Sequence, residues 1–262
     1  MQNAQKFFQN TGAIFLLFFE KIGKVFLFAA NAVKAWFNFK NYYPKNIWRE
    51  MVDIGFYSLP VVGITAIFTG AVLALQSYSS ASRFSAQNFI ATVVVLSITR
   101  ELGPVLAGLM VAGRVGASIA AEIGTMRVTE QIDALETLST NPIYYLVSPK
   151  LMAATIMLPF LVLIADIIGI FGGYIVSVGS LGFSSVPYLK NTFEYLEAID
   201  VISGLVKASA FGFIVALMGC YHGFHSDKGA QGVGKATTNA VVSSSILILC
   251  ANYFITQLFF AN

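Results

Sequence analysis

Charged residues are scarce in this sequence. Asp, Glu, Lys and Arg make up 11% of its 262 residues, whereas 56% are hydrophobic. In a soluble domain about a quarter of the residues are charged, so this chain has too few charges to cover a water-facing surface of its size. The composition excludes an ordinary soluble protein and indicates an integral membrane protein. The length suits a single membrane domain, residues 1–262.

Cysteine and histidine are also rare. Cys220 and Cys250 lie within or beside apolar runs, and the sequence has no CxxC pair or Cys/His spacing typical of zinc. His222 and His225 lack a third ligand nearby, so we interpret them as residues that flank a polar loop. The net charge of +3 is modest, and the basic residues form no patch interleaved with aromatic residues. These absences argue against a metal ion, another cofactor or a nucleic-acid partner.

Residues 1–50 lack the uninterrupted apolar segment of a signal peptide, because Glu20, Lys21 and Lys24 divide it. Hydrophobic residues recur there at helical spacing, namely Phe15, Phe18, Phe19, Ile22, Val25 and Phe26. This pattern predicts an amphipathic helix that lies in the membrane interface. The aromatic residues Trp36, Tyr42, Tyr43 and Trp48 follow, and such residues favour the headgroup layer.

Five apolar stretches are long enough to cross the membrane, which takes roughly 20 residues for about 30 Å of hydrocarbon. They are residues 54–78, 89–121, 146–178, 201–221 and 238–260. We therefore predict an all-α integral membrane protein with an N-terminal interfacial amphipathic helix plus five transmembrane helices. The more polar segment Leu181–Asp200, between the third and fourth spans, predicts a short helix outside the membrane.

Lysine and arginine are distributed unequally between the two ends of the predicted spans. Twelve lie in the N-terminal segment or in loops at the same end, two lie at the opposite end, and two lie inside spans. Cytoplasmic loops carry an excess of these residues. We therefore expect a cytoplasmic N-terminus and, after five spans, a C-terminus at Asn262 on the other side.

A compact acidic segment, AEIGTMRVTEQIDALETL (residues 121–138), separates the second and third spans. On a helical wheel the apolar face holds Val128, Ile132 and Leu135, and the acidic face holds Glu130, Asp133 and Glu136. Thr129 is expected to cap this helix, and Gly124 to break the preceding span. The pattern alone fits either a solvated loop helix without a partner or a contact for a soluble motor protein.

The sequence on both sides of this segment resembles a known family. RELGPVLAGLMVAGRVGASIAAEIGTMRVTEQIDALETLSTNPIYYLVSPK (residues 100–150) is similar to the permease subunit of MCE-associated lipid ABC transporters, the MlaE family. GKATTNAVVSSS (residues 234–245) resembles the start of the last span of that family. The resemblance covers nearly the whole chain and is least distinctive in the N-terminal 40 residues.

The resemblance implies a homodimer with a cytoplasmic MlaF-like ABC ATPase and a periplasmic MlaD-like MCE-domain hexamer. Phospholipid would move between the bacterial inner (cytoplasmic) membrane and the MCE protein, which maintains outer-membrane lipid asymmetry, and the C-terminus would be periplasmic. ATP and Mg would bind to the partner ATPase, and this chain would hold no cofactor. Segment 122–138 would be the coupling helix that contacts the ATPase. The expected contact residues are Glu122, Gly124, Arg127, Glu130, Gln131, Asp133 and Glu136.

The stretch GAQGVGKA (residues 229–236) nearly matches a phosphate-binding loop. Such a loop follows a strand and ends in Ser or Thr, but here a predicted transmembrane helix precedes it and Ala236 fills the hydroxyl position. We expect instead a flexible loop whose glycines allow a turn before the last span. The sequence has no other nucleotide motif, so we expect a subunit that is not itself an enzyme.

Charged residues also lie inside the predicted spans, where an ionised side chain facing lipid costs about 2.5–3.5 kcal/mol. The expected intramembrane charge network holds Arg100, Glu101 and Asp166. Such residues either lock helices together or line a polar cavity for a lipid headgroup. The expected lipid pathway includes Leu73, Gln76, Tyr78, Lys207 and Asn252.

Two other functions are compatible with these spans. The first is an ion-coupled secondary transporter that uses the intramembrane carboxylates Glu101 and Asp166 as a proton relay, although five spans without an inverted repeat count against it. The second is a scaffold that anchors an ATPase without transporting anything. A scaffold predicts no lipid-lined cavity.

Overall fold

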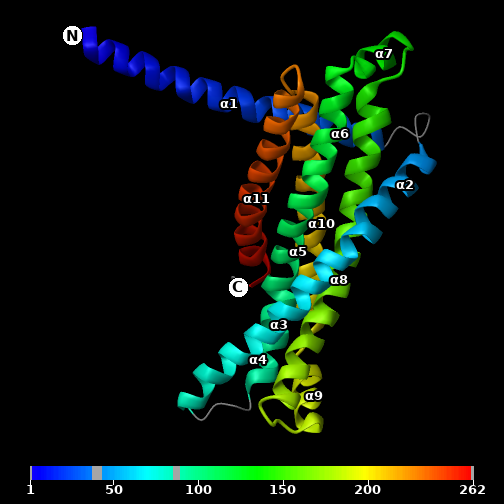
Figure 1. Cartoon of the computed structure of the whole chain (residues 1–262). Helices are drawn as coiled ribbons and strands as arrows, with labels where there is room; N and C mark the ends of the chain where they lie inside the picture. Colours follow the sequence, from blue (N-terminus) through cyan, green and yellow to red (C-terminus); the bar gives the residue numbers. More distant parts are fainter. Residues whose placement is uncertain (1, 37–42, 85–88, 261–262) are drawn as a thin grey trace.

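The computed structural model describes residues 2–36, 43–84 and 89–260, which contain helices and no β-strand. Five long helical segments lie side by side in a bundle, and one further helix extends sideways from it (Figure 1). The predicted all-α fold is confirmed. Tyr42 and Asn262, together with the side chains of Phe15 and Phe18, lie outside the described residues.

Five helical segments are long and apolar enough to cross a membrane, as predicted. Their bounds are Pro44–Ala81, Ile90–Val128, Ile143–Gly179, Ala198–Phe224 and Ala230–Phe260. The first consists of α2 (Pro44–Gly55) and α3 (Leu59–Ala81), and the second of α4 (Ile90–Ser97), α5 (Gly103–Val111) and α6 (Ala117–Val128). The other three are mainly α8 (Ser148–Gly179), α10 (Ala198–Phe224) and α11 (Ala230–Phe260).

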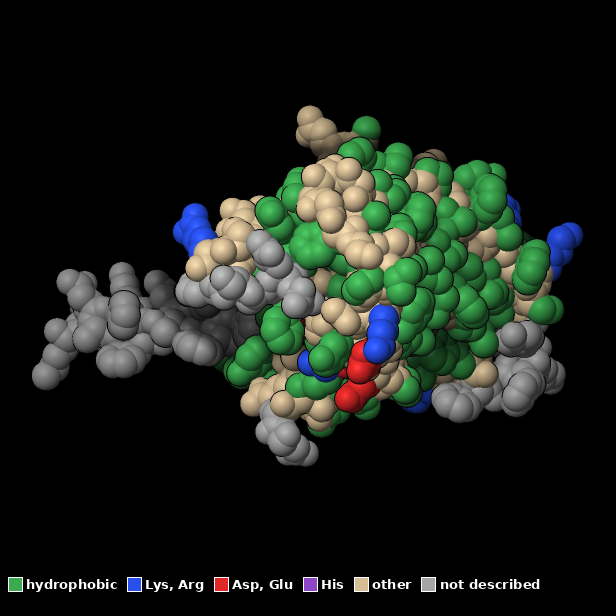
Figure 2. All heavy atoms as spheres, turned by 90° about the horizontal axis from the view of Figure 1, so that it is seen from below, with side chains coloured by type: hydrophobic (Ala, Val, Ile, Leu, Met, Phe, Trp, Pro, Cys, Tyr) green, Lys and Arg blue, Asp and Glu red, His purple; other side chains and the backbone are tan. Residues whose placement is uncertain are grey.

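Short helices lie at the two ends of the bundle. α7 (Gln131–Thr137) and the turn between α10 and α11 lie at one end, and α9 (Ser185–Glu194) lies at the other (Figure 1). α9 confirms the short helix predicted between the third and fourth spans. Hydrophobic side chains cover most of the face at the α9 end, and few charged ones are visible there (Figure 2).

The C-terminal part of α1 (Gln2–Trp36) lies at the α7 end of the bundle, and its N-terminal part extends sideways away from the bundle (Figure 1). Near its C-terminus, the buried Phe28 ring meets the rings of Tyr221 and Phe224 edge-on, with centroids 5.8 and 5.7 Å away. Phe19 and Phe26 are exposed. A long helix that lies across the end of the spans and presents aromatic side chains fits the predicted interfacial helix.

Glycine allows the first and third spans to pack closely. A Cβ atom at Gly70 of α3 would overlap the backbone of Gly169 on α8, and one at Gly172 would overlap the backbone of Ile67. Close backbone approach at small residues is typical of helix packing in membranes. The main buried core combines large apolar side chains, such as Leu158 of α8 and Phe211 of α10, with many alanines.

Three local predictions are wrong. α6 continues through Gly124 to Val128, and Gly124 is buried near Ser226, so this glycine serves helix packing rather than a break. The hydroxyl of Thr129 donates to a carbonyl within α6, and Glu130, with φ 60°, precedes α7 without any side-chain cap. Residues 229–236 are not a loop, because α11 begins at Ala230.

Candidate functional site

A polar cluster lies between α10, α11 and the middle of the second span. Lys207 of α10 donates from Nζ to Oε1 of Glu101 over 2.7 Å. From α11, the amide of Asn252 donates to Glu101 Oε2 over 2.7 Å, and the hydroxyl of Thr256 donates to Oε1 over 2.9 Å. The carboxylate of Glu101 therefore accepts three hydrogen bonds from two helices, which compensates its charge within an apolar span.

The local sequence of the second span prepares this contact. Residues Ile98–Leu102 form a wide π-helical turn, and Pro104 follows within two residues. Proline has no N–H to donate to the carbonyl four residues earlier, which here belongs to Arg100. Lys207 Nζ donates to that carbonyl oxygen over 2.7 Å. The lysine thus satisfies both a side-chain carboxylate and a backbone group that the helix itself leaves free.

A second ion pair lies next to this cluster. Arg100 Nε donates to Oδ1 of Asp200 over 2.6 Å, and the guanidinium also lies 4.5 Å from the centroid of the Phe260 ring. Asp200 is held in place at the start of α10, because its Oδ2 accepts the backbone N–H of Glu197 in a capping box. Adjacent residues of one helix therefore bind two different parts of α10.

The cluster is closed on one side and open on the other. The side chain of Lys207 has no exposed surface, whereas that of Glu101 is 39% exposed. The carbonyl oxygen of the Asn252 side chain is buried and has no hydrogen-bond partner among the described residues. The arrangement thus combines a buried ammonium, a partly accessible carboxylate and a buried amide oxygen that lacks a hydrogen-bond partner among the described residues.

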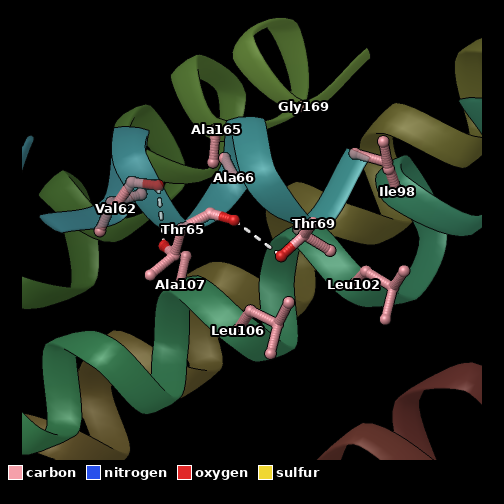
Figure 3. Close-up of a pocket in the computed structure, with 11 residues that line it drawn as sticks. Val62, Thr65, Ala66, Thr69, Ile98, Leu102, Leu106, Ala107, Ala165 and Gly169 are labelled. Carbon is pink, nitrogen blue, oxygen red and sulfur yellow. Dashed lines mark hydrogen bonds between the residues drawn. The ribbon is translucent and has the colours of Figure 1, made fainter. Parts of the chain in front are cut away.

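Asp166 of α8 lies apart from this cluster. It is buried, its Oδ1 lacks a hydrogen-bond partner in the described chain, and it lies against the backbone of Gly103. A pocket beside it, between α3, α5 and α8, has Thr65 and Thr69 on its wall (Figure 3). Its volume of about 10 Å³ is near the minimum for a single water molecule, so it is too small for a lipid.

The other residues expected on the lipid pathway lie on α3. Gln76 is exposed, Leu73 is half-buried, and the ring of the half-buried Tyr78 meets Phe183 edge-on with 5.9 Å between centroids. Lys207 and Asn252 lie instead at Glu101. Within the described part of the chain, no hydrogen bond joins the α3 residues to that cluster.

The residues expected to contact an ATPase fall into two groups. Ile132 fixes α7 by its fully buried side chain, and Arg127 of α6 donates to Asp133 over 2.6 Å. Four of the expected contact residues are exposed on or beside α7, namely Glu130, Gln131, Asp133 and Glu136. Gly124 is buried inside the bundle, and Glu122 lies two residues before it in α6.

Glu122 belongs to an ion triad that the sequence analysis missed. Lys150 Nζ, at the start of α8, lies 2.7 Å from Oε1 of Glu50 on α2 and 2.8 Å from Oε2 of Glu122. The lysine side chain is 3% exposed. Asp200 and Thr256 were missed as well. No local pattern could reveal these pairs, because the partners lie 28 to 155 residues apart in sequence.

Comparisons with known proteins give the family. The family model described as Permease MlaE matches residues 47–258. A probable ABC transporter permease protein of Rickettsia felis is 62% identical over 251 residues, which is 96% of each chain. A probable ABC transporter permease protein of Synechocystis is 41% identical over 216 residues, 82% of each chain. The Arabidopsis thaliana protein TRIGALACTOSYLDIACYLGLYCEROL 1, chloroplastic, is 34% identical over 216 residues, 82% of this chain and 62% of its own length.

The matched region begins in α2 and ends in α11, so it includes all five spans, the polar cluster and α7. The matching family and these relatives are permeases of ABC transporters. This assignment accounts for the five spans without an ion-driven transporter or a passive scaffold. The chain belongs to the MlaE permease family, as a multi-pass membrane subunit of an ABC transporter that is not itself an ATPase.

Proposed function

We propose that this permease moves phospholipid between the bacterial inner membrane and a periplasmic MCE-domain protein, and so maintains the lipid asymmetry of the outer membrane. An ABC permease works with an ATPase subunit, which here would be a cytoplasmic MlaF-like protein bound to each copy of a homodimer. A hexameric MlaD-like protein would receive or supply the lipid on the periplasmic side. The name of the Arabidopsis relative contains that of a glycerolipid, which agrees with a lipid as cargo.

The observation that carries this proposal is the half-open polar cluster around Glu101. A phospholipid headgroup that leaves the membrane surface meets the same desolvation penalty as a charged side chain in hydrocarbon. Of the three groups only the carboxylate of Glu101 is accessible, at 39% exposure, whereas the ammonium of Lys207 and the amide oxygen of Asn252 are buried behind it. In this proposal the cationic part of a zwitterionic headgroup exchanges its water for the Glu101 carboxylate, while Lys207 and Asn252 hold that carboxylate in place.

The α3 residues support a path beside this cluster. Gln76 and Tyr78 lie near the α9 end of α3, and Leu73 lies about 0.8 turns before Gln76 and about 1.4 turns before Tyr78, so polar and apolar side chains are mixed on that part of the helix. In this proposal the headgroup contacts the polar side chains, and the acyl chains contact Leu73. The greater number of basic residues at the α7 end supports a cytoplasmic N-terminus and a periplasmic C-terminus.

The coupling function is proposed for segment 122–138. α7 presents Glu130, Asp133 and Glu136 to solvent while Ile132 holds it against the bundle. A helix fixed on one side and acidic on the other is suited to a basic groove on a motor protein. Movement of the ATPase would then pass through α6 and α8, the two helices that flank α7.

A photocrosslinking experiment tests the lipid path. A photoreactive residue at Gln76 should capture phospholipid in the assembled, ATP-hydrolysing complex, and capture should change when ATP is withheld. The matched control is Phe160, an exposed residue on the surface of α8, which should capture bulk lipid whether or not ATP is present. Identical, ATP-independent capture at both positions would contradict the proposed path.

A second experiment tests the function as a whole. The complex is purified through an N-terminal tag, reconstituted, and supplied with fluorescent phospholipid, ATP and the soluble part of the MCE protein. We expect ATP-dependent exchange of lipid between vesicle and MCE protein. Loss of exchange in Glu101→Gln with retained ATPase binding supports the site, whereas exchange that needs a proton gradient instead of ATP contradicts the proposal.

A further inference from the structure

A large apolar groove lies outside the polar cluster, between α1, α10 and α11. Its volume is about 920 Å³, at the upper end of the range for pockets that hold small molecules. The wall from α1 holds Ile22, Val25, Phe26, Ala29, Ala30 and Val33. The wall from α10 and α11 holds Phe213, Leu217, Met218, Tyr221, His222, Ser243 and Leu247.

The depth of the groove matches one leaflet of a membrane. Phe213 and His222, at its two ends on α10, are nine residues apart, or about 14 Å along a helix. Half of the hydrocarbon layer is about 15 Å thick. α10 ends at Phe224, so His222 lies near the membrane surface at the α7 end. The groove therefore extends from that surface to about the middle of the membrane.

The groove is amphipathic along its length. Its deep part is lined by Phe213, Leu217 and Leu247, whereas His222 and Ser243 lie near its outer end. Nε2 of His222 lies 3.0 Å from Oγ of Ser243. The Ser243 hydroxyl donates its proton to the carbonyl of Asn239 over 2.7 Å, so it accepts the proton of Nε2–H. Nδ1 of His222, the unprotonated nitrogen of this tautomer, has no partner in the described part of the chain and can accept a hydrogen bond from a ligand.

We infer that this groove binds a glycerophospholipid of the leaflet at the α7 end whose headgroup carries a hydrogen-bond donor, such as an ethanolamine ammonium or a glycerol hydroxyl, with its acyl chains along α10 and its headgroup at His222. The shape favours a lipid over a second copy of the chain. α1 extends sideways from the bundle (Figure 1), so the groove is an inner corner beneath a helix, and flexible acyl chains fill such a corner better than a rigid helix does. Phe26 and Leu27 on α1 are exposed, so this corner opens towards surrounding lipid.

The polar end of the groove determines whether a lipid binds there in preference to the surrounding bilayer. Lipid tails are as apolar as the groove walls, so hydrocarbon contact alone gives little preference for the groove. A hydrogen bond that an N–H or O–H of the headgroup donates to Nδ1 of His222 supplies that preference. The site is separate from the Glu101 cluster and needs no ATP, so its test does not depend on the proposed transport function.

Photocrosslinking and native mass spectrometry of the purified complex test this site. After a detergent wash that removes bulk lipid, illumination should still give a phospholipid adduct with a photoreactive residue at Leu217, but not at the control position Ile167, an exposed residue of α8. His222→Phe keeps the volume but removes the hydrogen bond, and should lower the retained phospholipid about fivefold, the scale of one hydrogen bond. Ala30→Trp should fill the groove and abolish the adduct.

Three results would overturn the inference. An equal loss of phospholipid capture at Leu217 and Ile167 when the wash precedes illumination means that only bulk lipid was present. Chain-to-chain adducts at Leu217 mean that a second copy covers the groove. Unchanged lipid retention in both His222→Phe and Ala30→Trp, with normal thermal stability of the two variants, means that the retained lipid binds elsewhere.

Discussion

Substitution of Glu101 should destabilise the protein more than substitution of Lys207, its partner in the ion pair. The reason is that the two side chains differ in exposure. Lys207 has no exposed surface, whereas Glu101 is 39% exposed. In Glu101→Gln, the ammonium stays buried with neutral acceptors only, namely the carbonyl of Arg100 and the amide oxygen of the substituted side chain. Stranding a buried charge in this way costs about 3–5 kcal/mol.

The opposite substitution should be milder. In Lys207→Met the carboxylate of Glu101 keeps its hydrogen bonds from Asn252 and Thr256 and can recruit water on its open side. We expect a loss of about 1–2 kcal/mol, in the range for a lost hydrogen bond to a charged group. The double variant Glu101→Gln, Lys207→Met leaves no unpaired charge and should be more stable than Glu101→Gln alone.

Thermal unfolding of the purified complex in one detergent measures these differences. With roughly 2–4 °C per kcal/mol for a chain of this size, Glu101→Gln should lower Tm by about 6 °C or more, and Lys207→Met by about half as much. The order of the three variants is the test, because it depends less on detergent than the absolute values. A Tm for Lys207→Met below that for Glu101→Gln would refute the exposure argument.

Three further substitutions test the packing. Gly70→Ala should lower stability by about 1–3 kcal/mol through overlap with the α8 backbone, whereas the control Gly179→Ala, which meets open space, should leave Tm nearly unchanged; equal Tm values would contradict close packing there. Ile132→Ala removes the fully buried contact of α7 and should cost about 2–5 kcal/mol locally, seen as faster amide hydrogen exchange in α7 with little change in α9. Pro104→Ala supplies an N–H that competes with Lys207 for the carbonyl of Arg100, so the new amide should be protected from hydrogen exchange; rapid exchange there would show that the carbonyl remains with the lysine.

The sequence predicts the spans well because hydrophobicity and length decide them locally. Each predicted span falls on one helical segment of the structure. Helix ends were harder to predict, since residues at a helix end respond to tertiary contacts. Gly124 was expected to break a helix, but helix packing against the turn near Ser226 keeps it helical. α11 begins at Ala230 although glycines disfavour helices there.

The partners of the buried charges could not be predicted from the sequence. Arg100, Glu101 and Lys207 stood out because charges are rare in apolar spans, and this signal needs no knowledge of the fold. Their pairing follows from how α10 packs against the second span, and the pairs are about 100 residues apart. Adjacent positions on a helix point in different directions, so Arg100 and Glu101 bind separate partners.

The ion triad at Lys150 and the polar cluster at Glu101 each hold a different set of helices together. Near the α7 end, Lys150 joins α8 to α2 through Glu50 and to α6 through Glu122. α7 connects α6 to α8, so both helices that flank it are fixed to each other and to the first span. A displacement of α7 is therefore expected to move these three helices together rather than bend one of them. The Glu101–Lys207 cluster joins a different set, the second span with α10 and α11, and the second span belongs to both sets. A force applied at α7 is thus expected to reach the polar cluster through the second span.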